Sequence, residues 1–230
     1  MLQGLIDDFQ LCFVKNGRWE YLLSGLGVTL EVALAAIVLG LAVGFLVAVV
    51  RSTHDKYGHF PVLNFAAKAY LTIIRGTPMV VQLLITYYII LRSVDSKVLI
   101  AILAFGINSG AYQAEIIRAG IVSIDPGQME AGRALGLSYW RTMLRIILPQ
   151  AVRNVLPALG NEFIMIVKDT SLASTFFIGD LMTQCLLIKG TTYLTMEPLI
   201  MVAVVYFVVT FVLSKLLGMF ERRLRRGDIR

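Results

Sequence analysis

Two carboxylates, Glu162 and Asp169, interrupt an apolar stretch of this 230-residue sequence. An ionisable side chain within a membrane is costly and usually has a functional or structural partner. The two acids are nearly two helical turns apart, so they would share one helical face with Ala158 and Met165. We expect this face to border a polar cavity that holds a ligand. Alternatively, Glu162 only pairs with a basic residue of a neighbouring helix, and Lys168 only neutralises Asp169.

Further hydrogen-bond donors lie beside these acids. Asn161 precedes Glu162, and Thr170 and Ser171 follow Asp169. Amide and hydroxyl groups can donate to a ligand carboxylate. A broken, weakly apolar helix near the middle of a membrane is also where transporter sites tend to lie. These residues therefore predict a binding site, and no catalytic residue, because the sequence has no HExxH, GxSxG or Cys/His ligand pattern.

The longest polar interruption, residues 130–149, belongs to a loop over 125–149 that is expected to contain two short helices. Asp125 can cap the first helix, with Pro126 at its first position and Gln128 where a capping box places Glu or Gln. Gly136 should end it, and Ser138 should cap a second helix over 139–148.

The first of these helices carries small side chains that could enter a groove on a partner. Ala131, Gly132 and Ala134 lie there beside Met129 and Leu135. At Pro149 we expect the chain to turn back toward the membrane. The alternative is an ordinary connector between membrane helices.

The composition predicts an integral membrane protein. Hydrophobic residues make up 57% of the chain, charged residues 16%, and the mean hydropathy is +0.76. The charge of +6 does not indicate nucleic-acid binding, because the basic residues cluster on the loops of one membrane face. Cys12 and Cys185 have no metal or redox pattern, so both are expected to be inert, although a disulfide between them is possible. Asp7 and Asp8 argue against a cleavable signal peptide.

Five membrane spans are expected, with an all-α fold. They cover about 22–50, 76–91, 98–122, 154–169 and 198–217, in a membrane domain over 22–220. Residues 1–21 precede them, a polar hairpin covers 51–60, an inner-face helix 61–74, an interfacial or re-entrant helix 172–187, and a basic tail 221–230.

Two local features of the spans bear on packing. Gly40 and Gly44 form a GxxxG pattern, which either permits close helix contact or arises by chance in a glycine-rich chain. Glu115 and Arg118 lie at i, i+3 spacing, so we expect them to pair along one helical face.

The distribution of basic residues predicts the orientation. Fifteen Lys and Arg residues lie in 51–75, 118–153 and 215–230, against six in 1–21, 92–97 and 168–197. Because basic loops stay in the cytoplasm, the N-terminus is expected outside and the C-terminus and the 125–149 loop inside. An odd number of spans satisfies this arrangement.

Several short motifs follow one another from about residue 22 to the end. They are Arg75-Gly76-Thr77-Pro78, Val81-Gln82, Ala111-Tyr112, Ala114-Glu115-Ile116, Pro126-Gly127-Gln128, Glu130 to Ser138, Ile146, Leu148-Pro149, Asn161-Glu162, Lys168 to Leu172 and Glu221-Arg222-Arg223-Leu224. Together they resemble the permease subunits of polar amino acid ABC importers. The segment from Glu130 to Pro149 resembles the EAA loop of these subunits, with Gly132 in place of the Ala that is usual there.

This resemblance implies a type I ABC importer permease fold in the bacterial inner membrane. It implies a second permease subunit, identical or not, two cytoplasmic ATPase subunits and a periplasmic or lipid-anchored solute-binding protein. ATP and Mg²⁺ would be bound by the ATPase, since this chain has no GxxxxGK[ST] loop. The implied activity is alternating-access import of polar or charged L-amino acids.

Residue roles follow from the same resemblance. Substrate contact is expected at Glu162, Asp169, Asn161, Met165, Thr170 and Ser171. Coupling to the ATPase is expected at Glu130, Ala131, Gly132, Ala134, Leu135 and Gly136. The rival interpretations are an autonomous secondary transporter or channel, in which the buried acids couple ions, and a purely structural membrane subunit.

Overall fold

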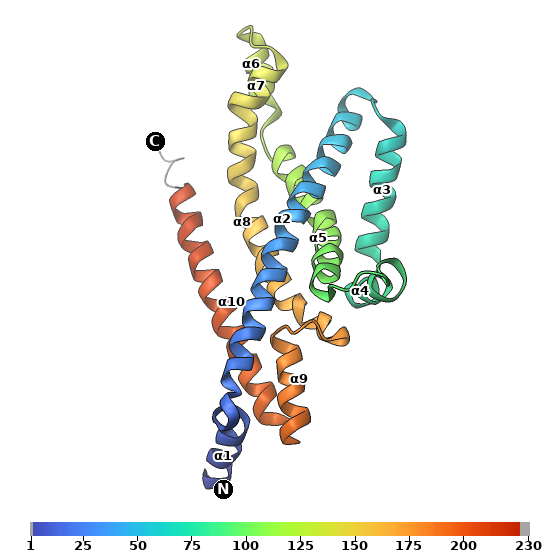
Figure 1. The fold of residues 1–230 in the computed structure, drawn as a ribbon. Coiled ribbons are helices and arrows are strands. Elements are labelled where there is room, and N and C mark those ends of the chain that lie inside the picture. Colours follow the sequence, from blue (N-terminus) through green and yellow to red (C-terminus); the bar gives the residue numbers. More distant parts are fainter. Residues whose placement is uncertain (1, 226–230) are drawn as a thin grey trace. The chain divides into compact units, whose positions relative to one another are not determined.

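The computed structural model describes residues 2–225, and every regular element within them is helical (Figure 1). The α-helices are α1 (Leu2–Phe9), α2 (Trp19–Tyr57), α3 (Pro61–Gly76), α4 (Met79–Ile85), α5 (Lys97–Val122), α6 (Pro126–Ala134), α7 (Tyr139–Thr142), α8 (Leu148–Asp169), α9 (Leu181–Thr192) and α10 (Met196–Arg225). Three π-helices, Gln10–Val14, Thr86–Ile90 and Met143–Ile147, and two 3-10 helices, Lys15–Gly17 and Thr170–Phe176, adjoin them. The last five residues of the predicted basic tail lie outside the described residues.

Among the described residues, three helices are each long and apolar enough to cross a membrane. They cover Trp19–Asp55, Lys97–Val122 and Met196–Leu224. Two bent pairs, Pro61–Gly76 with Met79–Ile90 and Tyr139–Phe176 with Leu181–Thr192, raise the number to five if each pair is one span. The all-helical membrane fold is thus confirmed, while the orientation of the termini stays a prediction.

The predicted second span, 76–91, is too short to cross alone. The helical residues there number 7 in α4 and 5 in the π-helix after it, or about 18 Å at 1.5 Å per residue. A hydrocarbon core is about 30 Å thick. The chain instead bends by 109° between Pro61–Gly76 and Met79–Ile90. Pro78, in extended conformation, separates the two helices.

The predicted polar hairpin at 51–60 is mostly helical. α2 runs on to Tyr57, and the reversal needs only the three residues before Pro61. Gly58 and Phe60 take positive φ values of 69° and 59° there. The backbone N–H of Gly58 still donates to the carbonyl of His54, which closes the last turn. Polar residues thus extend the helix past the apolar segment instead of ending it.

The described chain divides into two compact units, each built from separate stretches. The first contains residues 1–36, 78–105 and 164–215, and the second contains 37–77, 106–163 and 216–230. α2, α5, α8 and α10 each contribute residues to both units.

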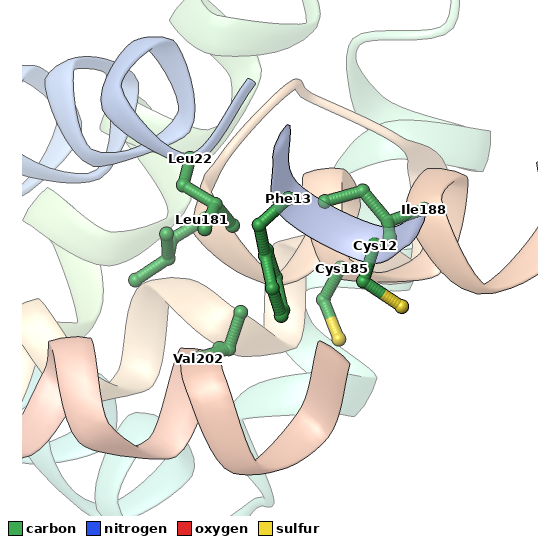
Figure 2. Packing of buried hydrophobic residues seen from close by; sticks show 7 residues of the cluster. All are labelled: Cys12, Phe13, Leu22, Leu181, Cys185, Ile188 and Val202. Carbon is green, nitrogen blue, oxygen red and sulfur yellow. The ribbon is translucent and has the colours of Figure 1, made fainter. Parts of the chain in front are cut away.

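The core of the first unit joins the N-terminal segment to α2, α9 and α10. Figure 2 shows the buried side chains Cys12, Phe13, Leu22, Leu181, Cys185, Ile188 and Val202 gathered there. Both cysteines are buried free thiols, so the possible disulfide is not formed. Asp180 caps α9 by accepting hydrogen bonds from the backbone N–H groups of Met182 and Thr183.

Glycines set the contact between α2 and α5 within the second unit. A Cβ atom at Gly44 would lie 2.9 Å from the backbone nitrogen of Ala114. A Cβ atom at Gly40 would lie closer still to the Gln113 amide nitrogen and 3.2 Å from Cβ of Ser109. On α5, a Cβ at Gly106 would lie 2.5 Å from Leu39 of α2. The GxxxG pattern of α2 therefore does permit close packing, as the first of our two interpretations holds.

The predicted ion pair between Glu115 and Arg118 is wrong. Glu115 instead lies 3.5 Å from Arg51 of α2 and 3.9 Å from Arg75 of α3, whereas Arg118 lies 3.6 Å from Asp55. The close approach of α2 and α3 to α5 brings these arginines to Glu115. Spacing along one helix permits a pair but cannot exclude a better partner on a neighbouring helix.

Candidate functional site

The carboxylate of Glu162 lies in a buried polar cluster between α8 and α5. Only 8% of the residue is exposed. The Ser109 hydroxyl donates to Glu162 Oε1 at 2.9 Å, and the Gln113 side-chain amide donates to the Ser109 hydroxyl at 2.8 Å. Gln113 Nε2 also lies 3.3 Å from the carbonyl of Ile37 on α2. The cluster thus joins three helices of the second unit.

The local sequence of α5 explains why these groups meet. Ser109 and Gln113 are four residues apart, so both project from one helical face. That face packs against Gly40, where any larger side chain would occupy the space of the Gln113 amide. Buried polar groups need hydrogen-bond partners, and this arrangement gives Glu162 a fixed donor from α5. Sequence reasoning missed both residues, although two amide or hydroxyl groups at i, i+4 spacing in an apolar span are a usable signal.

Asn161, the residue before Glu162, is exposed and uses its side chain locally. Its Nδ2 donates to the carbonyl of Pro157, one turn earlier in α8, at 3.1 Å. Pro157 lies inside the helix and has no backbone N–H to donate. The side chain of Asn161 thus bonds within α8, whereas that of Glu162 bonds to Ser109 of α5.

The other predicted contact residues belong to the first unit. Thr170 is fully buried and donates to the carbonyl of Val167 at 2.8 Å. Ser171 donates to the carbonyl of Lys168 at 2.7 Å. Asp169 is half-buried at the end of α8, and Met165 is 51% exposed. The predicted stripe along α8 thus has several environments instead of a single polar one.

The loop predicted to couple to a partner forms a compact helical hairpin in the second unit. Asp125 caps α6 by accepting from the Gly127 N–H at 2.8 Å, and Ser138 accepts from the Arg141 N–H at the start of α7. At the end of α6, Gly136 takes a φ of 80°. Its N–H donates to Arg133, and the N–H of Leu137 donates to Gly132, which is a Schellman motif. Both caps and the glycine stop are confirmed.

Two details of this loop differ from expectation. Gln128 forms no capping box; its amide exchanges two hydrogen bonds with the amide of Gln150, at 3.1 and 2.6 Å. Pro149 does not turn the chain, because α7, the π-helix Met143–Ile147 and α8 follow one another without a break. The carbonyl that Pro149 cannot bond, that of Arg145, lies in the π-helix, whose wider turn accommodates a proline.

The coupling residues divide into exposed and buried positions. Glu130, Ala131, Ala134, Leu135 and Gly136 are exposed, and Leu135 is 82% exposed. Gly132 is buried instead. A Cβ atom there would lie 2.5 Å from Cγ2 of Thr142 in α7. Gly132 therefore sets the distance between the two helices of the hairpin, beneath the exposed surface.

Among the residues that the structure describes, no three His, Cys, Asp or Glu side chains are placed to hold a metal ion. A buried carboxylate such as that of Glu162 can attract a cation and accept hydrogen bonds.

Two curated relatives are similar to this chain over most of its length. The arginine transport system permease protein ArtQ of Bacillus subtilis is 34% identical over 211 residues, which cover 90% of this chain and 94% of the relative. The L-cystine transport system permease protein TcyB of the same organism is 35% identical over 217 residues, covering 93% and 90%.

A solved structure is similar over the same length. A crystal structure of an amino acid ABC transporter with histidines is 40% identical, with a TM-score of 0.83, over 89% of this chain and 94% of that chain. The family described as the binding-protein-dependent transport system inner membrane component matches residues 37–226. This match covers most of the chain and includes all or part of each candidate membrane span. The chain therefore belongs to this family of inner-membrane permease components, with the type I ABC permease fold.

Proposed function

We propose that this chain is the pore subunit of an ATP-driven importer of polar or charged L-amino acids. The observation that carries the proposal is the similarity to amino acid permeases over about nine-tenths of the chain. The names of these two relatives specify arginine and L-cystine transport, so the side chain of the transported amino acid differs between them. The common chemistry of these cargoes is an α-ammonium and a carboxylate.

The proposed complex contains a second permease subunit, two cytoplasmic ATPases and a solute-binding protein. ATP and Mg²⁺ act on the ATPases, and this chain changes between inward- and outward-open states. The α6–α7 hairpin supports such a contact because it presents exposed apolar side chains, Leu135 at 82% and Trp140 at 67%. Large exposed apolar side chains on a capped hairpin are typical of a protein interface.

Glu162 is the proposed contact for the substrate ammonium or a cationic substrate side chain. Its burial strengthens attraction to a cation, since the local dielectric constant is low. The hydrogen bond from Ser109 holds the carboxylate in one orientation. The further proposed substrate contacts are Asp169, at the end of α8, and the residues Asn161, Met165, Thr170 and Ser171, which are near the two acids in the sequence. Rotation about χ1 would free the hydroxyls of Thr170 and Ser171 from their local carbonyls.

The test is amino acid uptake into proteoliposomes that contain the chain with its ATPase and solute-binding protein. Uptake is measured with and without internal ATP, for a panel of cationic, neutral and acidic amino acids. We expect ATP-dependent uptake that Glu162→Gln reduces at least tenfold. The control is Glu20→Gln, which makes the same chemical change at an exposed position at the start of α2.

Two outcomes contradict the proposal at different points. Gradient-driven uptake by the isolated chain would replace it with a secondary transporter. ATP-driven uptake that is unchanged in Glu162→Gln would keep the importer but remove Glu162 from the substrate pathway.

A further inference from the structure

A polar pocket lies in the second unit, formed by α2, α3 and α5. Its volume is about 450 Å³. The side chains of Arg51, Lys68, Thr72, Arg75 and Glu115 line it. None of these residues belongs to the cluster around Glu162, and the proposed amino acid transport does not use them.

The charges in this pocket do not balance. Three cationic side chains, from Arg51, Lys68 and Arg75, face one carboxylate, that of Glu115. The guanidinium nitrogens of the arginines lie 3.5 and 3.9 Å from the Glu115 oxygens. Charge-assisted hydrogen bonds between such groups are about 2.7–2.9 Å long. The carboxylate of Glu115 is therefore in weak contact with both arginines, and the side chains that line the pocket keep a net positive charge.

One lining side chain has a buried donor without a partner. Nε of Arg51 makes no hydrogen bond to any residue that the structure describes. A buried donor that lacks an acceptor is costly, so the Arg51 guanidinium gains stability if it turns and this donor meets an anion in the pocket.

The second arginine is already held in place. The Arg75 guanidinium lies 5.7 Å from the centre of the Tyr112 ring, in addition to its contact with Glu115. A cation that is stacked on an aromatic ring and a carboxylate is pre-oriented, which reduces the entropy lost on binding an anion.

We propose that this pocket binds a phosphate group, as either the headgroup of an anionic phospholipid or a free phosphate. A phosphate carries more negative charge than a carboxylate and has more acceptor oxygens. It suits a lining in which the Arg51 guanidinium, the Lys68 ammonium and the Thr72 hydroxyl can all donate. The three cations also lie in the segments that the basic-residue count places at the cytoplasmic side, where anionic lipid headgroups attract them. This inference does not rest on the proposed transport function.

The experiment uses the full chain, purified in a non-ionic detergent, and two probes. Native mass spectrometry counts bound phosphatidylglycerol against phosphatidylcholine, and calorimetry measures inorganic phosphate against chloride at equal ionic strength. We expect saturable binding of at least one phosphate probe. Lys68→Gln should weaken it at least tenfold, because the exposed Lys68 ammonium supplies attraction without an ion pair among the described residues.

The second variant and the control give opposite expectations. Glu115→Gln removes the only acidic side chain lining the pocket and should strengthen binding, which a purely structural ion pair would not do. Arg222→Gln, which removes a charge from the exposed part of α10, should bind like the wild type. Phosphatidylglycerol binding without inorganic phosphate binding identifies a lipid site, and binding of both identifies a general phosphate site. Binding of neither probe, or equal binding in Lys68→Gln, overturns the proposal.

Discussion

Replacing Gly132 with alanine should loosen the α6–α7 hairpin even though alanine favours helices. The new Cβ would lie 2.5 Å from Cγ2, 2.8 Å from Oγ1 and 3.3 Å from Cβ of Thr142. Carbon atoms in contact are normally about 3.5–4.0 Å apart. Thr142 is fully buried, and its hydroxyl donates to the carbonyl of Ser138 at 3.2 Å, so the side chain cannot turn away without losing that bond.

The two effects of this substitution oppose each other. Overpacking costs about 1–3 kcal/mol. Exchanging glycine for alanine within a helix stabilises the helix by about 1 kcal/mol. We therefore expect a net destabilisation of the hairpin of about 1 kcal/mol. Because the exposed residues of α6 are the proposed contact with the ATPase, transport per ATP hydrolysed should fall.

The assay compares uptake and ATP hydrolysis in proteoliposomes for Gly132→Ala, for Gly132→Ala combined with Thr142→Ala, and for Gly218→Ala. The double variant should recover part of the loss, since it removes Cγ2 and Oγ1 of Thr142. Gly218→Ala is the control, because no atom lies within 4 Å of a Cβ there. The packing argument would be refuted if the single variant transported as much substrate per ATP hydrolysed as the wild type and the double variant showed no increase over the single variant.

Three further predictions concern packing and docking. Gly44→Ala should lower the free energy of unfolding by about 1–3 kcal/mol, and with it the melting temperature, because the new Cβ would lie against backbone atoms that cannot rotate away. Gly27→Ala should leave the melting temperature unchanged, since no atom lies within 4 Å of a Cβ there. Gln128→Ala should destabilise the hairpin by about 1 kcal/mol, since it leaves the Gln150 amide without its reciprocal partner; chemical unfolding measures this change, and an unchanged midpoint contradicts it. Leu135→Asp should abolish co-purification with the ATPase without altering the melting temperature, since Leu135 is 82% exposed, and retained ATPase would contradict the proposed docking surface.

The sequence predicted features that depend on neighbouring residues in the chain. The cap at Asp125, the cap at Ser138 and the stop at Gly136 each require a donor or acceptor within about four residues, so local chemistry determines them. The continuation through Pro149 was missed because a π-helix, which no simple residue pattern marks, removes the usual conflict.

Features that depend on tertiary contacts were predicted poorly. The partners of Glu115 come from α2 and α3, elements that precede α5 in the sequence. Glu162 was identified as an unusual buried acid, but its donor Ser109 comes from α5, and periodicity within α8 carries no information about α5. Helix propensity and spacing describe one element at a time, so they identify candidate polar groups without pairing them.

The packing of α2 against α5 and the polar cluster around Glu162 are parts of one arrangement. Gly40 allows the backbone of α2 to approach Gln113, whose amide bonds both the Ile37 carbonyl and the Ser109 hydroxyl. Ser109 then donates to Glu162. A larger residue at position 40 would displace the amide of Gln113, and the effect would pass along two hydrogen bonds to the carboxylate. Gly40→Ala should therefore reduce substrate uptake through Glu162 although position 40 contacts no substrate in the proposed mechanism. If uptake by Gly40→Ala and by Ser109→Ala both match the wild type, the cluster does not orient Glu162 for transport.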